Sequence, residues 1–352
     1  MSDTASTAFA IRPGRVYVIA EAGVNHNGSL ELAQRLVDIA ADAGADAVKF
    51  QTFRAEELAG ADAPKAEYQK RTSGAAQSQL EMLRALELGR EAYEELRERC
   101  TARGLAFLST AFDAASLDML LDMGMQAIKV PSGEITNLPL LRHIGARAGD
   151  ADLPVILSTG MCTLDEVGDA VGALTRAGTP RGALTLLHCN TQYPTPFEDA
   201  NLLAMRTLAE AFPGCAVGYS DHTPGIPCAI AAAALGAAVV EKHCTLDRSM
   251  PGPDHAASIE PDELAEMVAG IRAVELALGT GEKAPTASER GNIAVARRHL
   301  VAARAIAAGE AFSPDNVAAR RTKAGGLSPM RWDDVMGTAA PRAFAAGEAI
   351  EL

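Results

Sequence analysis

Eight short apolar runs, each followed by a longer stretch with helical periodicity, constrain the fold of this chain more than any other feature. The runs are rich in β-branched residues, which are typical of buried strands. They occupy residues 16–23, 46–52, 105–113, 127–134, 154–161, 184–190, 216–222 and 238–245. Strand and helix alternating eight times over about 265 residues predict an α/β fold, the closed parallel (β/α)8 or TIM barrel. The rival architecture is an open, doubly wound sheet.

Polar residues gather at the end of each apolar run. In a (β/α)8 barrel the carboxyl ends of the strands form the face that carries the active site, whereas an open sheet would spread them along a line. We therefore expect the polar ends to converge on one mouth. They include Glu21, Lys49, Gln51, Thr110, Lys129, Ser132, Glu134, Asn190, Ser220, His222 and His243.

The chain divides by pattern into a barrel over 1–281, a linker over 282–294 and a small module over 295–352. The module repeats a turn, AIAAGEAF at 305–312 and AFAAGEAI at 343–350, which predicts a β-rich unit with two related hairpin turns. A module this short buries little apolar area, so we expect it to dock on its own barrel or on a partner subunit.

The connection between the second and third strands, residues 54–89, is unusually long and mixes charges with Gly, Ala and Ser. A long insertion on the catalytic face of a barrel is typical of a lid or binding loop. A solvated excursion without a role is the alternative.

The charge balance limits the class of partner. The chain has 32 Lys and Arg against 45 Asp and Glu, a formal net charge of −13, which argues against nucleic acid. No signal-peptide pattern and no apolar run long enough to span a bilayer occurs, so we expect neither secretion nor a membrane partner. Six cysteines without a CxxC pair indicate a reduced, cytoplasmic protein.

Two histidines end adjacent predicted strands. His222 and His243, with Glu241 two residues before the second, could bind a divalent transition metal and leave coordination positions open for catalysis. The alternative is that the imidazoles only form hydrogen bonds in the barrel mouth.

Two lysines and two glutamates end other strands. Lys49 and Lys129 could form a Schiff base or clamp an anionic phosphate, and the neighbouring hydroxyl and amide donors favour the clamp. Glu21 and Glu134 could act as a base for water or orient a substrate, or they could only neutralise the lysines. Asp254 lies in a stiff Pro-containing loop after the eighth run.

Together these motifs resemble the sialic acid synthase family, over nearly the whole chain and in the order that the family shows. Its members condense phosphoenolpyruvate with an N-acylated mannose-type sugar to give a nine-carbon 2-keto acid. The matching stretches are IAEAGVNHNGSLELA (19–33), AVKFQTF (47–53), KVPSGE (129–134), ILSTGM (156–161), LHCNTQYPTPFEDANL (187–202), GYSDHT (218–223), EKHCTLDRSMPGPDH (241–255) and TASER (286–290).

The resemblance implies more than the residues alone predict. It implies a C-terminal antifreeze-like (SAF) domain, a domain-swapped homodimer, and Mn²⁺, or else Mg²⁺ or Co²⁺, on His222 and His243. The phosphoenolpyruvate site that it implies comprises Lys49, Thr110, Lys129, Ser132, Asn190 or Thr191, and Ser220. On the sugar side it points to Gln51, Glu134, Tyr193 and Asp254, with Arg321 from the other subunit.

The sequence departs from the family pattern around Arg321, where related chains read Lys-Arg-Pro-Gly and this chain reads Arg320-Arg321-Thr322-Lys323. The sugar acceptor also stays open between N-acetylmannosamine, the leading expectation, and 2,4-diacetamido-2,4,6-trideoxymannose, which would give N,N'-diacetyllegionaminate. More remote alternatives are a Schiff-base pyruvate aldolase and a non-enzymatic sugar-binding or ice-binding protein.

Overall fold

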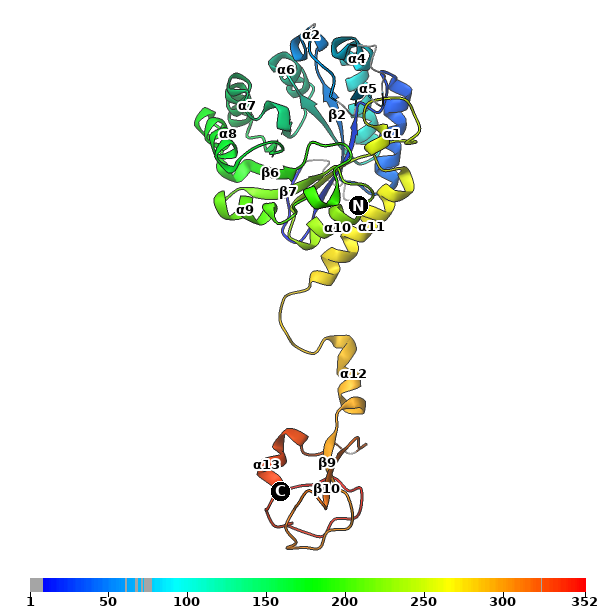
Figure 1. The fold of residues 1–352 in the computed structure, drawn as a ribbon, viewed down its shortest axis with the longest axis vertical. Helices are drawn as coiled ribbons and strands as arrows, with labels where there is room; N and C mark the ends of the chain where they lie inside the picture. The colour runs from blue at the N-terminus through cyan, green and yellow to red at the C-terminus, as the bar shows by residue number, and fades with distance from the viewer. Residues whose placement is uncertain (1–8, 61, 67–68, 71, 73–77, 324) are drawn as a thin grey trace, which may run out of the picture. The chain divides into compact units, whose positions relative to one another are not determined.

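The computed structural model (Figure 1) describes residues 9–60, 62–66, 69–70, 72, 78–323 and 325–352. Its contacts divide the chain into two compact units, Met1–Gly279 and Thr280–Leu352. The start of the chain, residues 1–8, lies outside the described residues, as does part of the long connection over 54–89.

The first unit is built on a closed barrel of eight parallel strands in sequential order. Each predicted apolar run contains one strand, which confirms the barrel and excludes the open sheet. Most of the strands are buried throughout because helices cover the outside of the barrel and side chains fill its interior. The strands are β1 (Tyr17–Gly23), β2 (Ala47–Thr52), β3 (Ala106–Ala111), β4 (Ile128–Val130), β5 (Val155–Ser158), β6 (Leu184–Cys189), β7 (Ala216–Asp221) and β8 (Val239–His243).

Helices surround the barrel and present small or branched apolar side chains to it. Helix α1 begins after Ser29, whose hydroxyl accepts a hydrogen bond from the Leu32 amide. The sequence places Leu32, Leu36, Ile39 and Ala40 on one face of this helix. Of these, Leu36 and Ala40 are buried in the structure, whereas Leu32 and Ile39 are only partly buried. Ala33 and Val37 complete the buried face, and its two alanines let the helix approach the strands closely.

The barrel unit contains these helices in the described residues: α1 (Leu30–Asp42), α2 (Ala55–Leu58), α4 (Gln79–Leu86), α5 (Arg90–Ala102), α6 (Ala114–Asp122), α7 (Leu138–Ala151), α8 (Leu164–Ala177), α9 (Ala204–Ala211), α10 (Pro227–Ala234) and α11 (Pro261–Leu278). Short 3-10 turns follow β4 at Ser132–Glu134, precede β6 at Arg181–Ala183, and occur at Phe197–Asp199 and His255–Ala257. Helices α2 and α4 belong to the long connection and lie against each other at the end of the barrel near β2 (Figure 1).

The second unit contains α12 (Ala287–Ala296), β9 (His299–Ala302), β10 (Val317–Arg320), a 3-10 turn at Pro329–Arg331 and α13 (Trp332–Val335). The segment expected as a linker, 282–294, includes most of α12. Strands β9 and β10 pair antiparallel. The two repeated turns pair with each other, because Ile306 and Phe344 exchange backbone hydrogen bonds of 3.0 and 2.9 Å.

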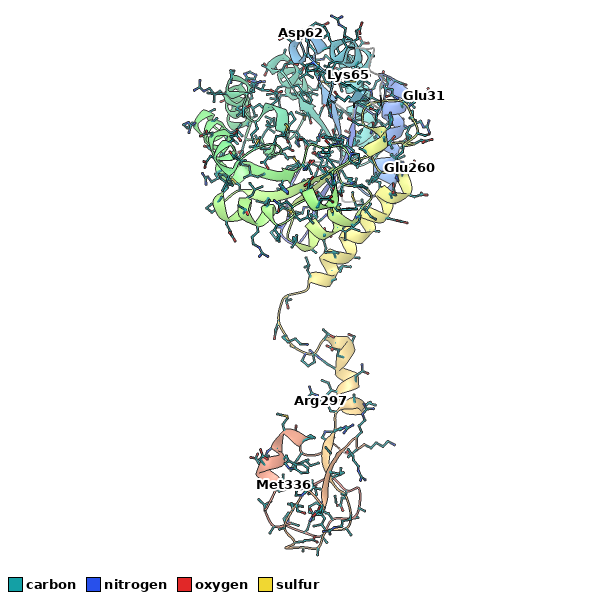
Figure 2. All side chains as sticks on the ribbon, in the orientation of Figure 1. Glu31, Asp62, Lys65, Glu260, Arg297 and Met336 are labelled. Carbon is teal, nitrogen blue, oxygen red and sulfur yellow. The ribbon has the colours of Figure 1, made fainter. Side chains whose placement is uncertain are left out.

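Acidic side chains such as Glu31 and Asp62 project from the outside of the barrel unit (Figure 2). None of the helices in the described part of the chain is both long and apolar enough to cross a membrane.

Candidate active site

A cavity of about 340 Å³ lies at the carboxyl ends of the barrel strands. Its lining contains every predicted site residue except Asn190 and Arg321: Glu21, Lys49, Gln51, Thr110, Lys129, Ser132, Glu134, Thr191, Tyr193, Ser220, His222, His243 and Asp254. The convergence of strand ends that the sequence predicts is therefore present in the structure.

Strand register places these side chains at matching heights. Lys49 of β2 lies opposite Glu21 of β1, and Glu21 lies opposite His243 of β8. In the adjoining pair of strands, Ser220 of β7 lies opposite Glu241 of β8. Because inward-facing positions of neighbouring parallel strands form layers, residues far apart in sequence meet in one plane.

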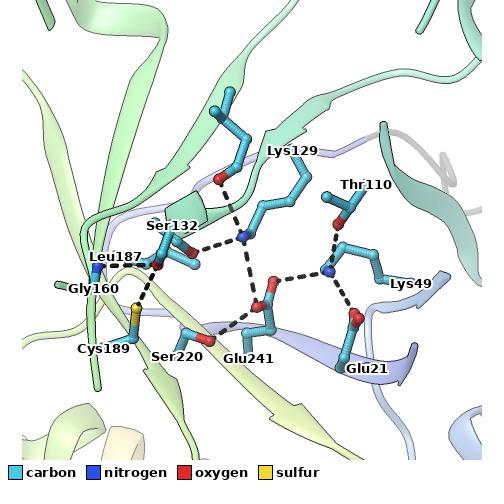
Figure 3. Close-up of polar contacts among 12 residues, drawn as sticks. Glu21, Lys49, Thr110, Lys129, Ser132, Gly160, Leu187, Cys189, Ser220 and Glu241 are labelled. Atoms are coloured by element: carbon cyan, nitrogen blue, oxygen red, sulfur yellow. Dashed lines mark hydrogen bonds and ion pairs between the residues drawn. The ribbon is translucent and has the colours of Figure 1, made fainter. Parts of the chain in front are cut away.

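Two lysines and two glutamates, Glu21, Lys49, Lys129 and Glu241, form what we call the charged floor of the cavity (Figure 3). The Lys49 Nζ lies 2.5 Å from the Glu21 carboxylate and 3.7 Å from that of Glu241. The Lys129 Nζ lies 3.7 Å from the other oxygen of Glu241. Glu241 therefore bridges the two ammonium groups.

Burial and mutual attraction set the ionisation of the charged floor. Burial alone would lower the pKa of Lys49, but the carboxylates of Glu21 and Glu241 raise it. Burial lowers the pKa of Lys129. Burial raises the pKa of Glu21 to about 7, against the opposing effect of Lys49. The Glu241 carboxylate stays ionised, because the two lysines outweigh its burial and lower its pKa.

Hydroxyl groups surround the two ammonium groups. Lys49 donates a hydrogen bond of 2.8 Å to the Thr110 hydroxyl, and Lys129 donates one of 2.6 Å to the Ser158 hydroxyl. The Ser220 hydroxyl donates to Glu241 at 2.9 Å. This arrangement of two cations and several hydroxyls in a buried cavity can hold an anion that carries more than one charged group.

The two histidines lie side by side at the carboxyl ends of β7 and β8. The ring centroids of His222 and His243 are 5.4 Å apart, and the Tyr193 ring lies 4.1 Å from that of His222. Burial lowers the pKa of His222 to about 4 and lowers that of His243 as well. Both imidazoles are therefore neutral near pH 7, which leaves a nitrogen lone pair on each ring available.

The chemistry of this pair fits a divalent metal ion. His222 Nδ1 contacts the Asn190 carbonyl oxygen, which orients its ring, and His243 Nδ1 is buried with no hydrogen-bond partner among the described residues. Within the described residues, no cluster of three or more His, Cys, Asp or Glu side chains has metal-site geometry. A metal here would have two protein ligands and would take the others from water or substrate.

Asp254 presents a carboxylate to the cavity without any hydrogen bond or ion pair among the described residues. Burial raises its pKa to about 6. Its backbone carbonyl accepts a hydrogen bond of 2.7 Å from Ser258 Oγ, and the Asn25 side chain donates to Ser258 Oγ at 2.9 Å. These contacts hold the Asp254 backbone while its carboxylate stays available to a ligand.

His255 anchors the same loop to the end of β1. Its Nδ1 lies 2.6 Å from Thr245 Oγ1, and its Nε2 lies 3.2 Å from Asn27 Oδ1. The Asn27 amide donates to the Pro251 carbonyl. A Cβ on Gly252 would approach His255 Cδ2 to 2.6 Å, so glycine is needed for this close packing.

Two predicted residues lie elsewhere. Asn190 turns away from the cavity, because its Oδ1 accepts a hydrogen bond of 2.7 Å from the Gln192 amide, whereas Thr191 lines the cavity. Arg321 is exposed in the C-terminal unit, where its Nε donates to the Ala296 carbonyl at 3.1 Å.

The structure adds residues that the sequence did not assign to these roles. Glu241 was considered only as a metal ligand, and its spacing from His243, with both side chains inward, was the available signal. Ser158 ends the fifth apolar run. Apolar residues of α2 and α4 also line the cavity; the spacing of Leu83 and Leu86 is helical, but nothing in the sequence shows that this helix faces the barrel mouth.

Comparison with known proteins gives consistent matches. Residues 36–283 match the NeuB family, and residues 297–351 match the SAF domain. The N,N'-diacetyllegionaminic acid synthase of Campylobacter jejuni is 47% identical over 96% of this chain and 99% of its own. That of Legionella pneumophila is 44% identical over 94% and 92%. The crystal structure of the N-acetylneuraminic acid synthetase of Leptospira borgpetersenii covers 79% of this chain and 90% of its own, with 38% identity and a TM-score of 0.69.

Proposed function

The chain belongs to the NeuB family, and from that premise we propose that it condenses phosphoenolpyruvate with an N-acylated mannose-type sugar. The product is a nine-carbon 2-keto acid, and phosphate is released. The charged floor carries the proposal, because Glu241 holds Lys49 and Lys129 together in a buried cavity that suits one small, multiply charged anion.

Phosphoenolpyruvate has a phosphate and a carboxylate, so a single lysine would leave one anion uncompensated. Burying an uncompensated charge costs several kcal/mol. Two ammonium groups with Thr110, Ser132 and Ser220 nearby meet both ends of the molecule.

The reaction that we propose breaks the C–O bond of the enol phosphate. C3 of phosphoenolpyruvate attacks the open-chain aldehyde carbon of the sugar, which forms the C–C bond, and positive charge develops at C2. The aldehyde oxygen becomes an alkoxide and takes up a proton, while water adds at C2 and gives up a proton. The tetrahedral intermediate then loses phosphate with cleavage of the C2–O bond, and the C2 hydroxyl gives up its proton and becomes the ketone. Glu21 takes the proton from water, since its pKa near neutrality suits a general base.

We propose that His222 and His243 would hold a divalent ion, because their imidazoles are neutral and adjacent. That this ion is Mn²⁺ is the expectation from the family resemblance, which we extend to this chain as a proposal. When bound, such an ion supplies a Lewis acid that polarises the aldehyde oxygen. The chain's own part is to orient the sugar, with Gln51, Glu134, Tyr193 and Asp254 lining the cavity around it. Removal of divalent ions should abolish turnover, and re-addition of Mn²⁺ should restore it; full turnover without metal would remove the role given to the histidines.

The test of the function is release of inorganic phosphate from phosphoenolpyruvate with N-acetylmannosamine and with 2,4-diacetamido-2,4,6-trideoxymannose, assayed side by side. Release with either sugar, together with a nine-carbon product by mass, supports the proposal. Release with neither contradicts it. Borohydride with pyruvate should trap no adduct on Lys49 or Lys129, whereas a Schiff-base aldolase would be labelled.

We further propose that the enzyme is a cytoplasmic, domain-swapped homodimer in which Arg321 serves the active site of a second copy. Free thiols at all six cysteines support a reducing location. Arg321 does not line the cavity of the barrel unit. At a low phosphoenolpyruvate concentration, Lys129→Met and Arg321→Ala subunits should each have little activity alone, and mixing them should restore activity if the arginine acts across subunits. No recovery after exchange would contradict the swap.

A further inference from the structure

An apolar surface closes one side of the cavity above the charged floor. It comes from the end of β2, from α2 and α4, and from the residue after β3. We call it the apolar wall: Phe53, Leu58, Met82, Leu83, Leu86 and Phe112. The remaining sides of the cavity carry mainly polar or charged groups, so its two halves differ sharply in chemistry.

The apolar wall is a packed structure with its own hydrophobic cluster. Phe53, Met82, Leu83 and Leu86 are each less than 9% exposed. Phe53 and Phe112 meet edge to face, with ring centroids 6.0 Å apart. Arg84 of α4 pairs with Glu56 of α2 at 2.7 Å.

The loop between β1 and α1 packs closely against α4. A Cβ on Gly28 would lie 2.5 Å from the Ala85 carbonyl oxygen, so only glycine permits this approach of the loop to the helix. The apolar wall is therefore held in place without a ligand, by its own hydrophobic cluster and by the loop that contains Gly28.

The chemistry fixes which part of the sugar faces the apolar wall. The aldehyde carbon has to reach C3 of phosphoenolpyruvate, which the lysines hold at the charged floor. The far end of the open chain, C4 to C6, then lies toward the mouth, where the side chains of α2 and α4 line the cavity.

Resting on the proposed function, we infer that the apolar wall selects a sugar that ends in a methyl group and carries a second acylamino group over one that ends in a hydroxymethyl group. A C6 hydroxyl against Leu and Phe side chains would lose its hydrogen bonds to water without replacement. The C6 methyl group of a 6-deoxy, 4-acetamido sugar has no hydrogen bonds to lose there. The polar atoms of its 4-acetamido group need a partner, and the Gln79 side-chain amide at the start of α4, which also lines the cavity, can supply one. A pocket of this kind discriminates by about 10-fold to 200-fold.

The experiment compares kcat/KM for 2,4-diacetamido-2,4,6-trideoxymannose and N-acetylmannosamine at saturating phosphoenolpyruvate. The wild-type protein should prefer the diacetamido sugar by at least about 10-fold. Leu58→Gln, which places an amide in the apolar wall at a half-buried position, should reduce that preference several-fold and leave the KM for phosphoenolpyruvate unchanged.

Leu80→Gln is the matched control. Leu80 belongs to the same hydrophobic cluster but does not line the cavity, so its replacement tests loss of packing without a change in the wall. Preference of the wild-type protein for N-acetylmannosamine would overturn the inference while leaving the proposed function intact. Equal shifts in Leu58→Gln and Leu80→Gln would also overturn it. Phosphate release with neither sugar would instead remove the proposed function itself.

Discussion

The charged floor of the barrel and the repeated turns of the C-terminal unit both pair a basic side chain with a glutamate, but in opposite surroundings. Lys49 and Glu21 are 3% and 2% exposed, whereas Arg342 and Glu348 are 44% and 37% exposed. The Arg342–Glu348 pair lies in a solvent-exposed turn, where the high dielectric of water leaves an ion pair with little effect on the free energy of unfolding. The Lys49–Glu21 pair lies away from water, where its charges would interact strongly with a charged ligand.

The two units also differ in overall charge. The C-terminal unit has ten Lys and Arg against eight Asp and Glu, so the formal charge of −13 divides into −15 for the barrel unit and +2 for the C-terminal unit. The anion-binding site that we propose therefore lies in the more acidic unit. Local placement of Lys49 and Lys129, rather than net charge, decides what the cavity can bind.

The largest expected effect comes from removing one cation of the charged floor. Lys129→Met should raise the KM for phosphoenolpyruvate by at least about 100-fold, a loss of about 3 kcal/mol, because the anion would be buried with half its compensation. Steady-state phosphate release measures it. Near-normal kinetics would show that Lys129 is only a structural residue.

A buried lysine outside the cavity should behave differently. Lys242 is fully buried and lies 2.8 Å from Asp221, and it does not line the cavity. Lys242→Met should lower the free energy of unfolding by about 3–5 kcal/mol, because Asp221 would be left unpaired. Urea denaturation measures the change, and a second substitution, Asp221→Asn, should recover part of it. Unchanged stability in Lys242→Met would contradict this assignment.

The Asp254 carboxylate in the cavity should lower the free energy of unfolding when it is ionised, because it is buried without a partner among the described residues. Burial raises the pKa of Asp254 to about 6 in the folded protein, so its contribution is most favourable below its unfolded pKa near 4 and is lost as pH rises through 6. Asp254→Asn should therefore stabilise the protein at about pH 8 by up to about 3 kcal/mol and have little effect at about pH 4.

Denaturation of wild type and Asp254→Asn at the two pH values measures this difference. The same variant should raise the KM for the sugar, which separates a ligand-binding carboxylate from one that only destabilises. Equal stability differences at both pH values would rule out the ionisation as the cause.

The smallest effect is expected in the repeated turns. Glu310 accepts a hydrogen bond from the Ala307 amide at 3.0 Å and pairs with Arg304 at 2.9 Å. The Ala307 amide and Arg304 lower the pKa of Glu310 to about 2, so its contribution is present above its unfolded pKa and is lost as pH falls toward 2.

Glu310→Gln should lower the melting temperature of the C-terminal unit only slightly and remove this acid dependence, as followed by circular dichroism. Glu348→Gln, at the equivalent position of the second repeat, should do the same. If Glu310→Gln or Glu348→Gln destabilised the protein as much as Lys242→Met does, exposed and buried ion pairs would not differ in their contribution to stability.

The barrel and most of the cavity lining were predictable from the sequence, because both follow from apolar runs of a few residues and from the polar residues that end them. Each strand is an apolar run, and most of the candidate site residues follow from their place at the end of one. Thr191, Tyr193 and Asp254 lie in loops, and their assignment came from the family resemblance. The bridging role of Glu241 was not predictable, since it depends on how the closed barrel brings β8 close to both β2 and β4. The choice between Asn190 and Thr191 depends on a turn in which the Asn190 side chain bonds the Gln192 amide. The apolar wall depends on how α2 and α4 fold back over the mouth.

The pairing of the two repeated turns has a consequence for how the C-terminal unit folds. The two repeats supply backbone partners to each other through the bridge of Ile306 with Phe344, and Ala311 of the first repeat also bridges to Ala339, just before the second. Nine buried apolar residues, drawn from β9, from both repeats and from the segment between them, make up the core of this unit. Neither half can be satisfied alone, so the duplicated sequence encodes one cooperative folding unit rather than two.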